Sequence, residues 1–245
     1  MEKHKIIAMG DTHGRPKWKD IVTQEVDANK IIFIGDYFDA RDGGYSANRQ
    51  IENFKDILAF KQANMDRVVL LTGNHDYHYI LAMDEQYSQY QDRYAKDISA
   101  VVEPAIAEGL LEMCYWDGKF LFTHAGLTKT WAEKWLGNTI ISQPMVKAIN
   151  DLLKYNPAAF KFAFGANGSY SGDDVTQSPI WVRTGSLLDD MVVDVICVVG
   201  HTQVKGVQIT SRYPNLIMID CLGTTYEYLA IEDGTPKISH ARLGN

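Results

Sequence analysis

The stretch KIIAMGDTHG, residues 5–14, places a short apolar run directly before a turn that carries Asp11 and His13. The same arrangement returns in KIIFIGDYFD, residues 30–39, and in VVLLTGNHD, residues 68–76. Apolar residues recur at helical spacing between these runs. This β-α-β-α-β order predicts a parallel sheet that is flanked by helices and joined by right-handed connections.

The helical spacing predicts where the helices lie. It indicates helices over residues 16–26 and 47–63, and two more between residues 128 and 155. Residues 77–108 are predicted to form one or two helices, which Pro104 interrupts because proline lacks the backbone N–H donor.

The second half of the chain predicts a further sheet. The turn pair Asp117-Gly118 separates apolar runs at 110–116 and 119–123, which indicates a hairpin. Glycine and aspartate make residues 164–178 polar, as is typical of a mobile surface loop. Short runs separated by turn residues then predict a second, mainly antiparallel sheet from residues 192–199, 204–210, 216–219, 225–231 and 237–240.

Length and composition bound the class of protein. The 245 residues are 46% hydrophobic and 22% charged, without a linker or repeat, so we expect a single domain over residues 1–245 with a helical insert at 77–108. A net charge of −7 without a basic stripe argues against extended nucleic acid as a partner. No run is apolar enough for a membrane span and no signal-peptide core follows Met1, so we expect a cytoplasmic protein with reduced cysteines.

Polar side chains follow five apolar runs at the point where each run ends. In α/β sheets, ligand sites collect beyond the carboxyl ends of strands, so these turns should converge. Taken singly, Asp and Asn are common caps and turn residues, and a lone His is usually structural. Imidazoles serve neither purpose, so their recurrence favours a metal site in the turns at residues 10–14, 35–39, 73–76, 124–126 and 200–202.

The donor types restrict the metal. Carboxylates, an amide oxygen and neutral imidazoles form a mixed oxygen and nitrogen set that suits Mn²⁺, Fe or Zn²⁺. The candidates exceed what one ion needs, so we expect two divalent ions, of which Mn²⁺ is favoured. One carboxylate must then bridge ions that lie about 3.5–4 Å apart.

The five blocks GDTHG, GDYFD, GNHD, HAG and GHT, in this order, resemble those of the calcineurin-like metallophosphoesterases. The pattern is most similar to the bacterial and phage Ser/Thr protein phosphatase branch, and the resemblance covers residues 5 to about 231. It implies an α/β (α+β) fold in which two mixed β-sheets pack as a sandwich with flanking helices, a four-layer α/β/β/α arrangement.

The resemblance also implies a set of metal ligands. Asp11 and His13 would hold the first ion, and Asp36 would bridge both ions. The second ion would be held by the remaining matched positions, Asn74, His124 and His201.

Catalytic roles follow from the same resemblance. His75 matches the general acid of the family, and Asp39 matches the carboxylate that orients it. Trp181-Val182-Arg183 resembles a Trp-x-Arg element whose arginine grips the substrate phosphate. A hydroxide between the two metals would attack phosphorus in line, with the proton from His75 going to the leaving oxygen.

Two positions depart from the pattern of the branch and the wider family. Ala40 stands where the Ser/Thr phosphatase branch has an arginine, and Arg41 follows one residue later, which leaves open whether Arg41 replaces it. Gln203 stands where many members of the wider family have a second histidine. This agrees with the Ser/Thr-like branch and predicts a more water-ligated first ion.

The sequence therefore predicts a dimetal phosphoesterase that hydrolyses phosphate monoesters of a phosphoprotein or a small molecule. Hydrolysis of a nucleotide, a dinucleoside polyphosphate or a cyclic phosphodiester is the alternative on the same fold, and a non-catalytic binding scaffold is a further one. The oligomeric state is not indicated by the sequence.

The other histidines and aromatic residues are expected to be structural. His78 follows the GNHD block and is expected on a helix, away from substrate. Trp131 and Trp135 have helical spacing that is typical of core packing. Core or surface packing is also favoured over a substrate rim for Tyr87, Tyr90 and Tyr94.

Overall fold

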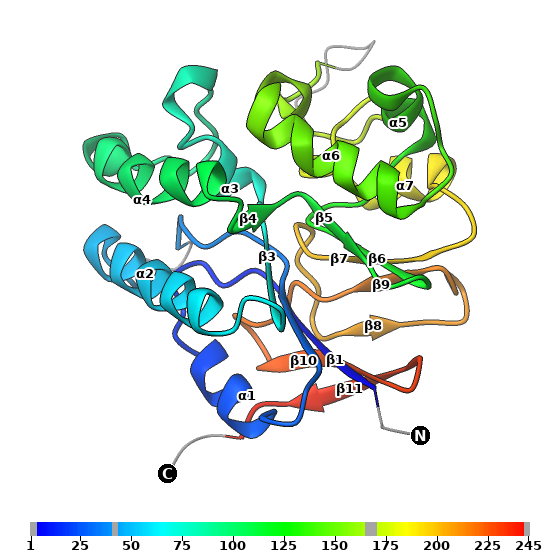
Figure 1. Cartoon of the computed structure of the whole chain (residues 1–245), viewed down its shortest axis with the longest axis horizontal. Coiled ribbons are helices and arrows are strands. Elements are labelled where there is room, and N and C mark those ends of the chain that lie inside the picture. Colours follow the sequence, from blue (N-terminus) through cyan, green and yellow to red (C-terminus); the bar gives the residue numbers. More distant parts are fainter. Residues whose placement is uncertain (1–3, 41–43, 165–170, 243–245) are drawn as a thin grey trace.

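A computed structural model describes residues 4–40, 44–164 and 171–242, and two β-sheets organise them (Figure 1). The first sheet has the order β11-β10-β1-β2-β3-β4, and its four strands β1 to β4 run parallel. Its strands are β1 (Lys5–Met9), β2 (Lys30–Phe33), β3 (Val68–Leu71), β4 (Leu111–Glu112), β10 (Glu227–Glu232) and β11 (Thr235–His240).

The second sheet has the order β5-β6-β7-β9-β8 and is also mixed. The three inner strands run parallel, whereas the edge strands β5 and β8 pair antiparallel with their neighbours. Its strands are β5 (Cys114–Trp116), β6 (Phe120–Thr123), β7 (Ile196–Val199), β8 (Gln208–Ile209) and β9 (Leu216–Met218). The expected fold of two mixed sheets with flanking helices is confirmed.

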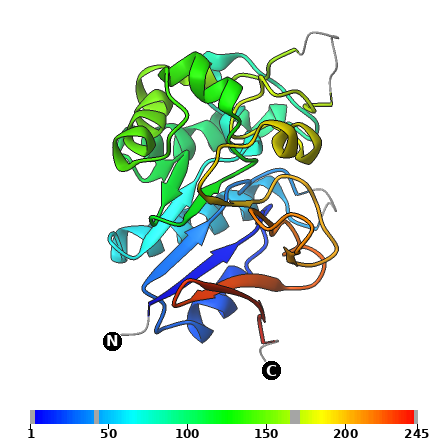
Figure 2. The ribbon, with the colours of Figure 1, turned by 90° about the vertical axis from the view of Figure 1, so that its right-hand side faces the viewer.

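Helices lie outside the two sheets (Figures 1 and 2). Helix α2 packs on β3, and α6 packs on β5. Strands β1, β2 and β3 are apolar and almost completely buried, as expected for a parallel sheet that is covered on both faces. The helices are α1 (Trp18–Gln24), α2 (Ala47–Ala63), α3 (Asn74–Tyr77), α4 (Ala95–Ala107), α5 (Lys129–Leu136), α6 (Gln143–Tyr155) and α7 (Thr184–Asp190), with 3₁₀ turns η1 (Leu81–Met83), η2 (Asp92–Tyr94) and η3 (Pro157–Phe160).

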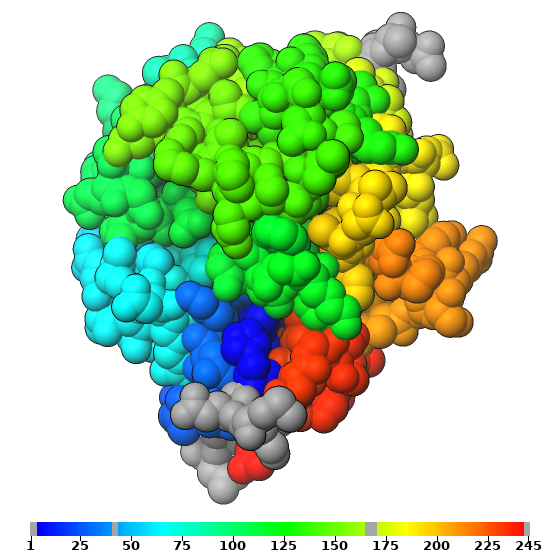
Figure 3. Space-filling view, turned by 45° about the vertical axis from the view of Figure 1, so that its right-hand side comes forward, coloured from blue at the N-terminus to red at the C-terminus, as the bar shows by residue number. Residues whose placement is uncertain are grey.

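The C-terminal strands do not form one mainly antiparallel sheet, so that prediction is wrong. Strand β10 pairs antiparallel with β1 and carries β11 with it into the first sheet. Figure 3 shows the start of the described chain, in blue, directly beside the C-terminal strands, in red. The pairing of β10 with β1 joins residues that are more than 200 positions apart in the sequence. Local hydrophobic periodicity does not encode such a long-range pairing.

The segment 77–108 is less helical than predicted. Only α3, two 3₁₀ turns and α4 are regular there, and an irregular path joins them. Helix α4 continues through Pro104, so the predicted interruption is wrong. Pro104 and Ala100 lie on the exposed face of α4, where water can satisfy the carbonyl that loses its donor. The opposite face of α4 is buried, and this packing outweighs the low helix propensity of proline.

The predicted strand at residues 110–116 is divided between the sheets. Strand β4 pairs with β3 of the first sheet, and β5 pairs with β6 of the second in the expected hairpin. The two α-helices predicted between 128 and 155 are confirmed as α5 and α6, and Trp131 is buried in the core with its Nε1 atom donating to Ala159 O at 3.1 Å. Among the described residues, no helix has both the length and the hydrophobicity that a membrane span requires.

Candidate metal centre and adjoining pocket

The five polar turns meet where the two sheets face each other. They follow β1, β2 and β3 of the first sheet and β6 and β7 of the second. All six predicted ligands are brought together, and each is at most 4% exposed. The structure therefore gathers donors from all along the chain into one buried cluster, formed by Asp11, His13, Asp36, Asn74, His124 and His201.

The backbone of these turns is unusual for the residues that occupy it. His13, Asp36, Asp39 and His201 all have positive φ angles, between 44° and 60°. This left-handed conformation costs a non-glycine residue about 1–3 kcal/mol, and such strain concentrates at functional sites. The strained backbone of the turns therefore lowers the stability of the fold, but it orients these four side chains.

Glycine permits the close approach of neighbouring turns. A Cβ atom at Gly73 would lie 2.1 Å from Asp36 Oδ1, and one at Gly200 would lie 2.2 Å from Asp11 Oδ1. Any side chain at these positions would displace a carboxylate of the cluster. Gly73 and Gly200 are thus packing requirements of the cluster itself.

Backbone carbonyls fix the orientation of three imidazole rings. His13 Nδ1 lies 2.6 Å from Phe38 O, and His124 Nδ1 lies 2.9 Å from Ile34 O. His201 Nε2 lies 3.2 Å from Trp181 O. A carbonyl accepts only, so each of these ring nitrogens carries the proton and the other nitrogen presents its lone pair.

The unprotonated nitrogens face other acceptor atoms. His124 Nε2 lies 3.1 Å from Asn74 Oδ1 and 3.5 Å from Asp36 Oδ1, and His201 Nδ1 lies 2.8 Å from Asn74 Oδ1. Among the described residues, the buried Asp36 Oδ2 accepts no hydrogen bond. Lone pairs that converge without a donor between them repel one another unless a cation lies among them, so the cluster fits divalent metal.

Burial keeps these imidazoles in the form that binds metal. It lowers the pKa of His124 below the ordinary value, and it lowers the pKa of His201 further, with additional contributions from the neighbouring His124 ring and from the charge of Arg183. A neutral imidazole is the form that coordinates a metal ion. Asp11, Asp36 and His124 also place ligand atoms close enough together to share one ion.

Asp76, the last residue of the GNHD block, holds two turns together. Its carboxylate accepts from the backbone N–H groups of Asp36, Tyr37 and Gly73 at 2.7–2.8 Å. Burial and the charge of Asp36 raise the pKa of Asp76, and these three donors oppose the rise. The side chain joins the end of β2 to the end of β3. Sequence reasoning assigned no role to Asp76.

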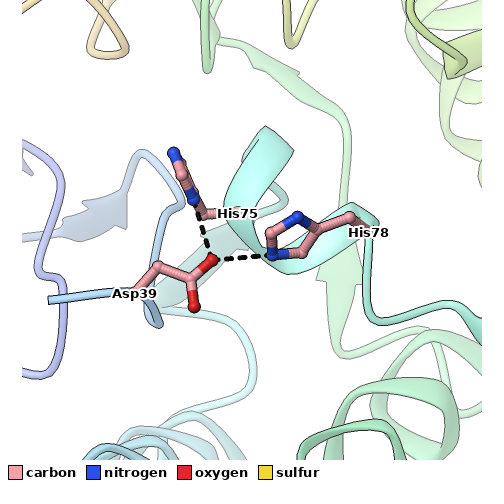
Figure 4. Close-up of side chains that lie close together, drawn as sticks. All are labelled: Asp39, His75 and His78. Carbon is pink, nitrogen blue, oxygen red and sulfur yellow. Dashed lines mark hydrogen bonds and ion pairs between the residues drawn. The ribbon is translucent and has the colours of Figure 1, made fainter. Parts of the chain in front are cut away.

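Asp39 forms a second cluster with His75 and His78 (Figure 4), and the centroid of the His75 ring lies 5.5 Å from that of the His13 ring of the first cluster. Asp39 Oδ2 lies 2.8 Å from His75 Nδ1 and 2.7 Å from His78 Nε2. Asp39 Oδ1 accepts from Tyr79 Oη at 2.6 Å and from Gln91 Nε2 at 2.9 Å. Burial raises the pKa of Asp39, but the contacts with His75 and His78 outweigh it and bring the pKa to about 2. Asp39 is therefore a carboxylate.

His78 was expected on a helix and away from substrate. The structure places it at the C-cap of α3 and in contact with Asp39, a contact that the sequence did not predict. The backbone N–H of Tyr87 points to His78 Nδ1 at 3.4 Å, so Nε2 carries the proton and faces Asp39. Burial lowers the pKa of His78, which favours this neutral form. The spacing of three residues between His75 and His78 was the available signal, because residues i and i+3 share a face of a helical turn.

Arg183 lies directly beside the metal-ligand cluster. Its Nη1 atom lies 3.2 Å from His201 O and 3.4 Å from Thr202 Oγ1, and the residue is the N-cap of α7. The other predicted arginine, Arg41, lies outside the described residues, as do residues 165–170 of the loop expected at 164–178. The role predicted for Arg41 therefore stays a prediction.

A pocket of about 540 Å³ opens onto both clusters. Asn74, His75, Arg183 and His201 line its inner end. Its outer wall is formed by residues from the irregular segment after α3 and from the chain on either side of residues 165–170, and it includes Tyr87. A molecule in this pocket would contact the predicted acid, arginine and metal ligands together.

This chain is similar to a known protein family and to solved structures. A family model described as calcineurin-like phosphoesterase matches residues 4–205. A solved Saccharomyces cerevisiae protein serine/threonine phosphatase, described as similar to human phosphatase PP5, matches with a TM-score of 0.57 and 15% identity over 99% of this chain and 81% of that chain. A conserved protein of Streptococcus pneumoniae, described as a predicted phosphoesterase, matches with a TM-score of 0.31 and 12% identity over 98% of each chain. The yeast structure shows a shared fold.

Proposed function

The chain belongs to the calcineurin-like phosphoesterase family, and on that premise we propose that it hydrolyses phosphate monoesters in the manner of a Ser/Thr protein phosphatase. The observation that carries the proposal is the pocket in which the ligand cluster, His75 and Arg183 share one space. The yeast protein of the same fold is described as a serine/threonine phosphatase, which supports the choice of monoesters.

We assign two divalent ions to the cluster of six ligands. Asp11 and His13 would hold one ion, and Asn74, His124 and His201 would hold the other. Asp36 would serve both, because its Oδ2 lies 3.7 Å from His13 Nε2 and its Oδ1 lies 3.5 Å from His124 Nε2. The mixed oxygen and nitrogen donors suit Mn²⁺ best, with Fe and Zn²⁺ as the alternatives.

Bound divalent ions would supply charge that acidifies a water nucleophile and offsets charge on the phosphoryl oxygens. Arg183 adds a guanidinium at the same end of the pocket, and charge-assisted hydrogen bonds of this kind orient phosphate strongly. His75 donates a proton from its ring to the leaving oxygen, which contributes about 10²–10⁴-fold. Asp39 fixes the ring through His75 Nδ1 and stabilises the imidazolium.

Metal reconstitution with a substrate panel tests the proposal. Protein stripped with EDTA is loaded separately with Mn²⁺, Fe²⁺, Zn²⁺ and Mg²⁺, and assayed on an aryl phosphate, phosphoserine peptides, mononucleotides, dinucleoside polyphosphates and cyclic nucleotides. We expect no turnover without metal, restoration with Mn²⁺, and the highest kcat/KM on monoesters. A dinucleoside polyphosphate or a cyclic nucleotide as the best substrate would replace monoesterase activity with the alternative function.

A variant of the acid tests the assignment of His75. His75→Asn should keep its metals and lose more activity on alkyl phosphates than on nitrophenyl phosphate, because nitrophenolate leaves without a proton. Equal losses on both substrates, or loss of metal, would contradict the role given to His75.

A further inference from the structure

Aromatic rings that lie edge to face line the pocket beyond the metal ligand His201, on which Trp181 packs with ring centroids 5.8 Å apart. Trp181 is 7% exposed, and its ring lies between Tyr87 and Phe162. The ring centroids of Tyr87 and Trp181 are 4.2 Å apart at 80°, and those of Phe162 and Trp181 are 5.0 Å apart at 88°. Tyr87 is backed by His78, whose ring stacks on it at 5.4 Å. The wall is therefore built from rings that hold one another in place.

Carboxylates share this wall with the aromatic rings. Asp84 and Glu85 both line the pocket, Asp84 being exposed and Glu85 half-buried. Glu85 Oε2 lies 3.4 Å from the backbone N of Phe162, so the carboxylate is tied to the aromatic wall. Among the described residues that line the pocket, Arg183 is the only Lys or Arg, and it lies at the inner end against His201.

The pocket thus has two ends of opposite character. The inner end, with Arg183 and the metal-ligand cluster, suits the phosphate group. The outer end combines aromatic rings with two carboxylates, and this combination attracts a cation through ring quadrupoles and charge-assisted hydrogen bonds.

We propose that the outer end of the pocket binds a guanidinium or ammonium group carried by the leaving group of the phosphate ester. The proposal rests on the proposed function and narrows its substrate class to monoesters with a cationic leaving group. A nucleoside polyphosphate is disfavoured by the same wall, because its additional phosphates would meet Asp84 and Glu85. A cationic group on an arginine-containing phosphopeptide and one on a small aminoalkyl phosphate offer the same chemistry.

Matched pairs of substrates test whether the charge of the leaving group, and not its shape, determines the preference of the enzyme. Phosphoserine peptides that differ only in arginine or glutamine beside the phosphoserine form the first pair. Phosphocholine and 3,3-dimethylbutyl phosphate, its neutral carbon isostere, form the second. We expect kcat/KM to favour the cationic member of at least one pair by about 10-fold or more. The pair that responds identifies the source of the cation.

Two double variants locate the effect. Asp84→Asn combined with Glu85→Gln should reduce the ratio between cationic and neutral substrates to near 1. Glu108→Gln combined with Glu133→Gln removes the same charge from exposed positions outside the pocket and should leave the ratio unchanged. A ratio near 1 in the unmodified protein, or a ratio that survives in the pocket variant, would overturn the proposal.

Binding without turnover separates this proposal from the proposed function. Calorimetry measures the affinity of the metal-free protein for the dephosphorylated arginine and glutamine peptides, and for choline. A preference for arginine or choline that the pocket variant loses supports the cation site even if no ester is hydrolysed. Equal affinity for the two peptides, with no binding of choline, would overturn it even in an active phosphatase.

Discussion

His78 Nε2 lies 2.7 Å from Asp39 Oδ2, the same oxygen that lies 2.8 Å from His75 Nδ1 (Figure 4). The two histidines come from one helical turn and its C-cap, while Asp39 comes from the turn after β2. His78 therefore fixes the carboxylate that orients the proposed acid, without lining the pocket itself. We describe His78 as a positioning residue.

The first prediction concerns His78. His78→Ala should lower kcat on an alkyl phosphate by about 10-fold or more while KM changes little, as is typical for removal of a partner that orients a functional group. His78→Gln, which offers an N–H donor in a similar place, should recover part of the loss. The loss should be smaller on nitrophenyl phosphate. His240→Gln, at an exposed histidine, is the control, and an equal loss on both substrates would indicate a merely structural role.

The second prediction concerns the bridging carboxylate. Asp36→Asn should lower metal occupancy at both sites, because Asp36 lies between His13 and His124. His201→Ala should empty chiefly one site, since His201 Nδ1 lies 2.8 Å from Asn74 Oδ1, a ligand assigned to the same ion. Elemental analysis after dialysis measures both. Two tightly held ions in Asp36→Asn would exclude the bridge.

The third prediction concerns Arg183. Arg183→Ala should lower kcat/KM by about 10²-fold or more without loss of metal, because a charge-assisted contact with the reacting group disappears. Arg183→Lys should recover only part of this activity, since lysine lacks the bidentate geometry. Arg41→Ala should cost clearly less. A larger loss in Arg41→Ala would mean that Arg41 replaces the arginine missing at Ala40.

The fourth prediction concerns pH. Burial raises the pKa of Glu85 to about 7, although the Phe162 N–H group and the charge of Lys161 oppose the rise. Tyr77 lies close enough to interact with its charge, and the pocket lining around it includes the ionisable groups of Asp84, Arg183, His75, Tyr87 and His201. A raised acid pKa means that Glu85 is neutral below pH 7 and charged above it. The preference for the cationic member of a substrate pair should therefore grow from pH 6 to pH 8. Glu85→Gln should remove this growth, and an unchanged pH profile in that variant would exclude Glu85 as its cause.

Local sequence was sufficient for the elements that carry the ligands. Each apolar run and the polar turn after it are contiguous, so residues 5–14 and 30–39 predict both a strand and the donors at its end. Parallel strands bring their carboxyl ends to one edge, and this single topological rule predicted that Asp11, Asp36 and Asn74 would meet. The helix at residues 47–63 was predicted with its observed bounds, because apolar residues at helical spacing are a local signal.

Only the tertiary structure decided which distant segments became partners. Strand β10 pairs with β1 instead of joining the second sheet. A strand offers the same backbone N–H and C=O groups to any neighbour, so its hydrophobic pattern does not indicate which strand it pairs with. The contact of His78 with Asp39 and the wall of Tyr87, Phe162 and Trp181 also join residues far apart in the chain. Periodicity reports whether a side chain is buried, but not what it is buried against. The sequence therefore predicted the set of candidate metal ligands, and the packing of distant segments decided the shape and charge of the pocket beside it.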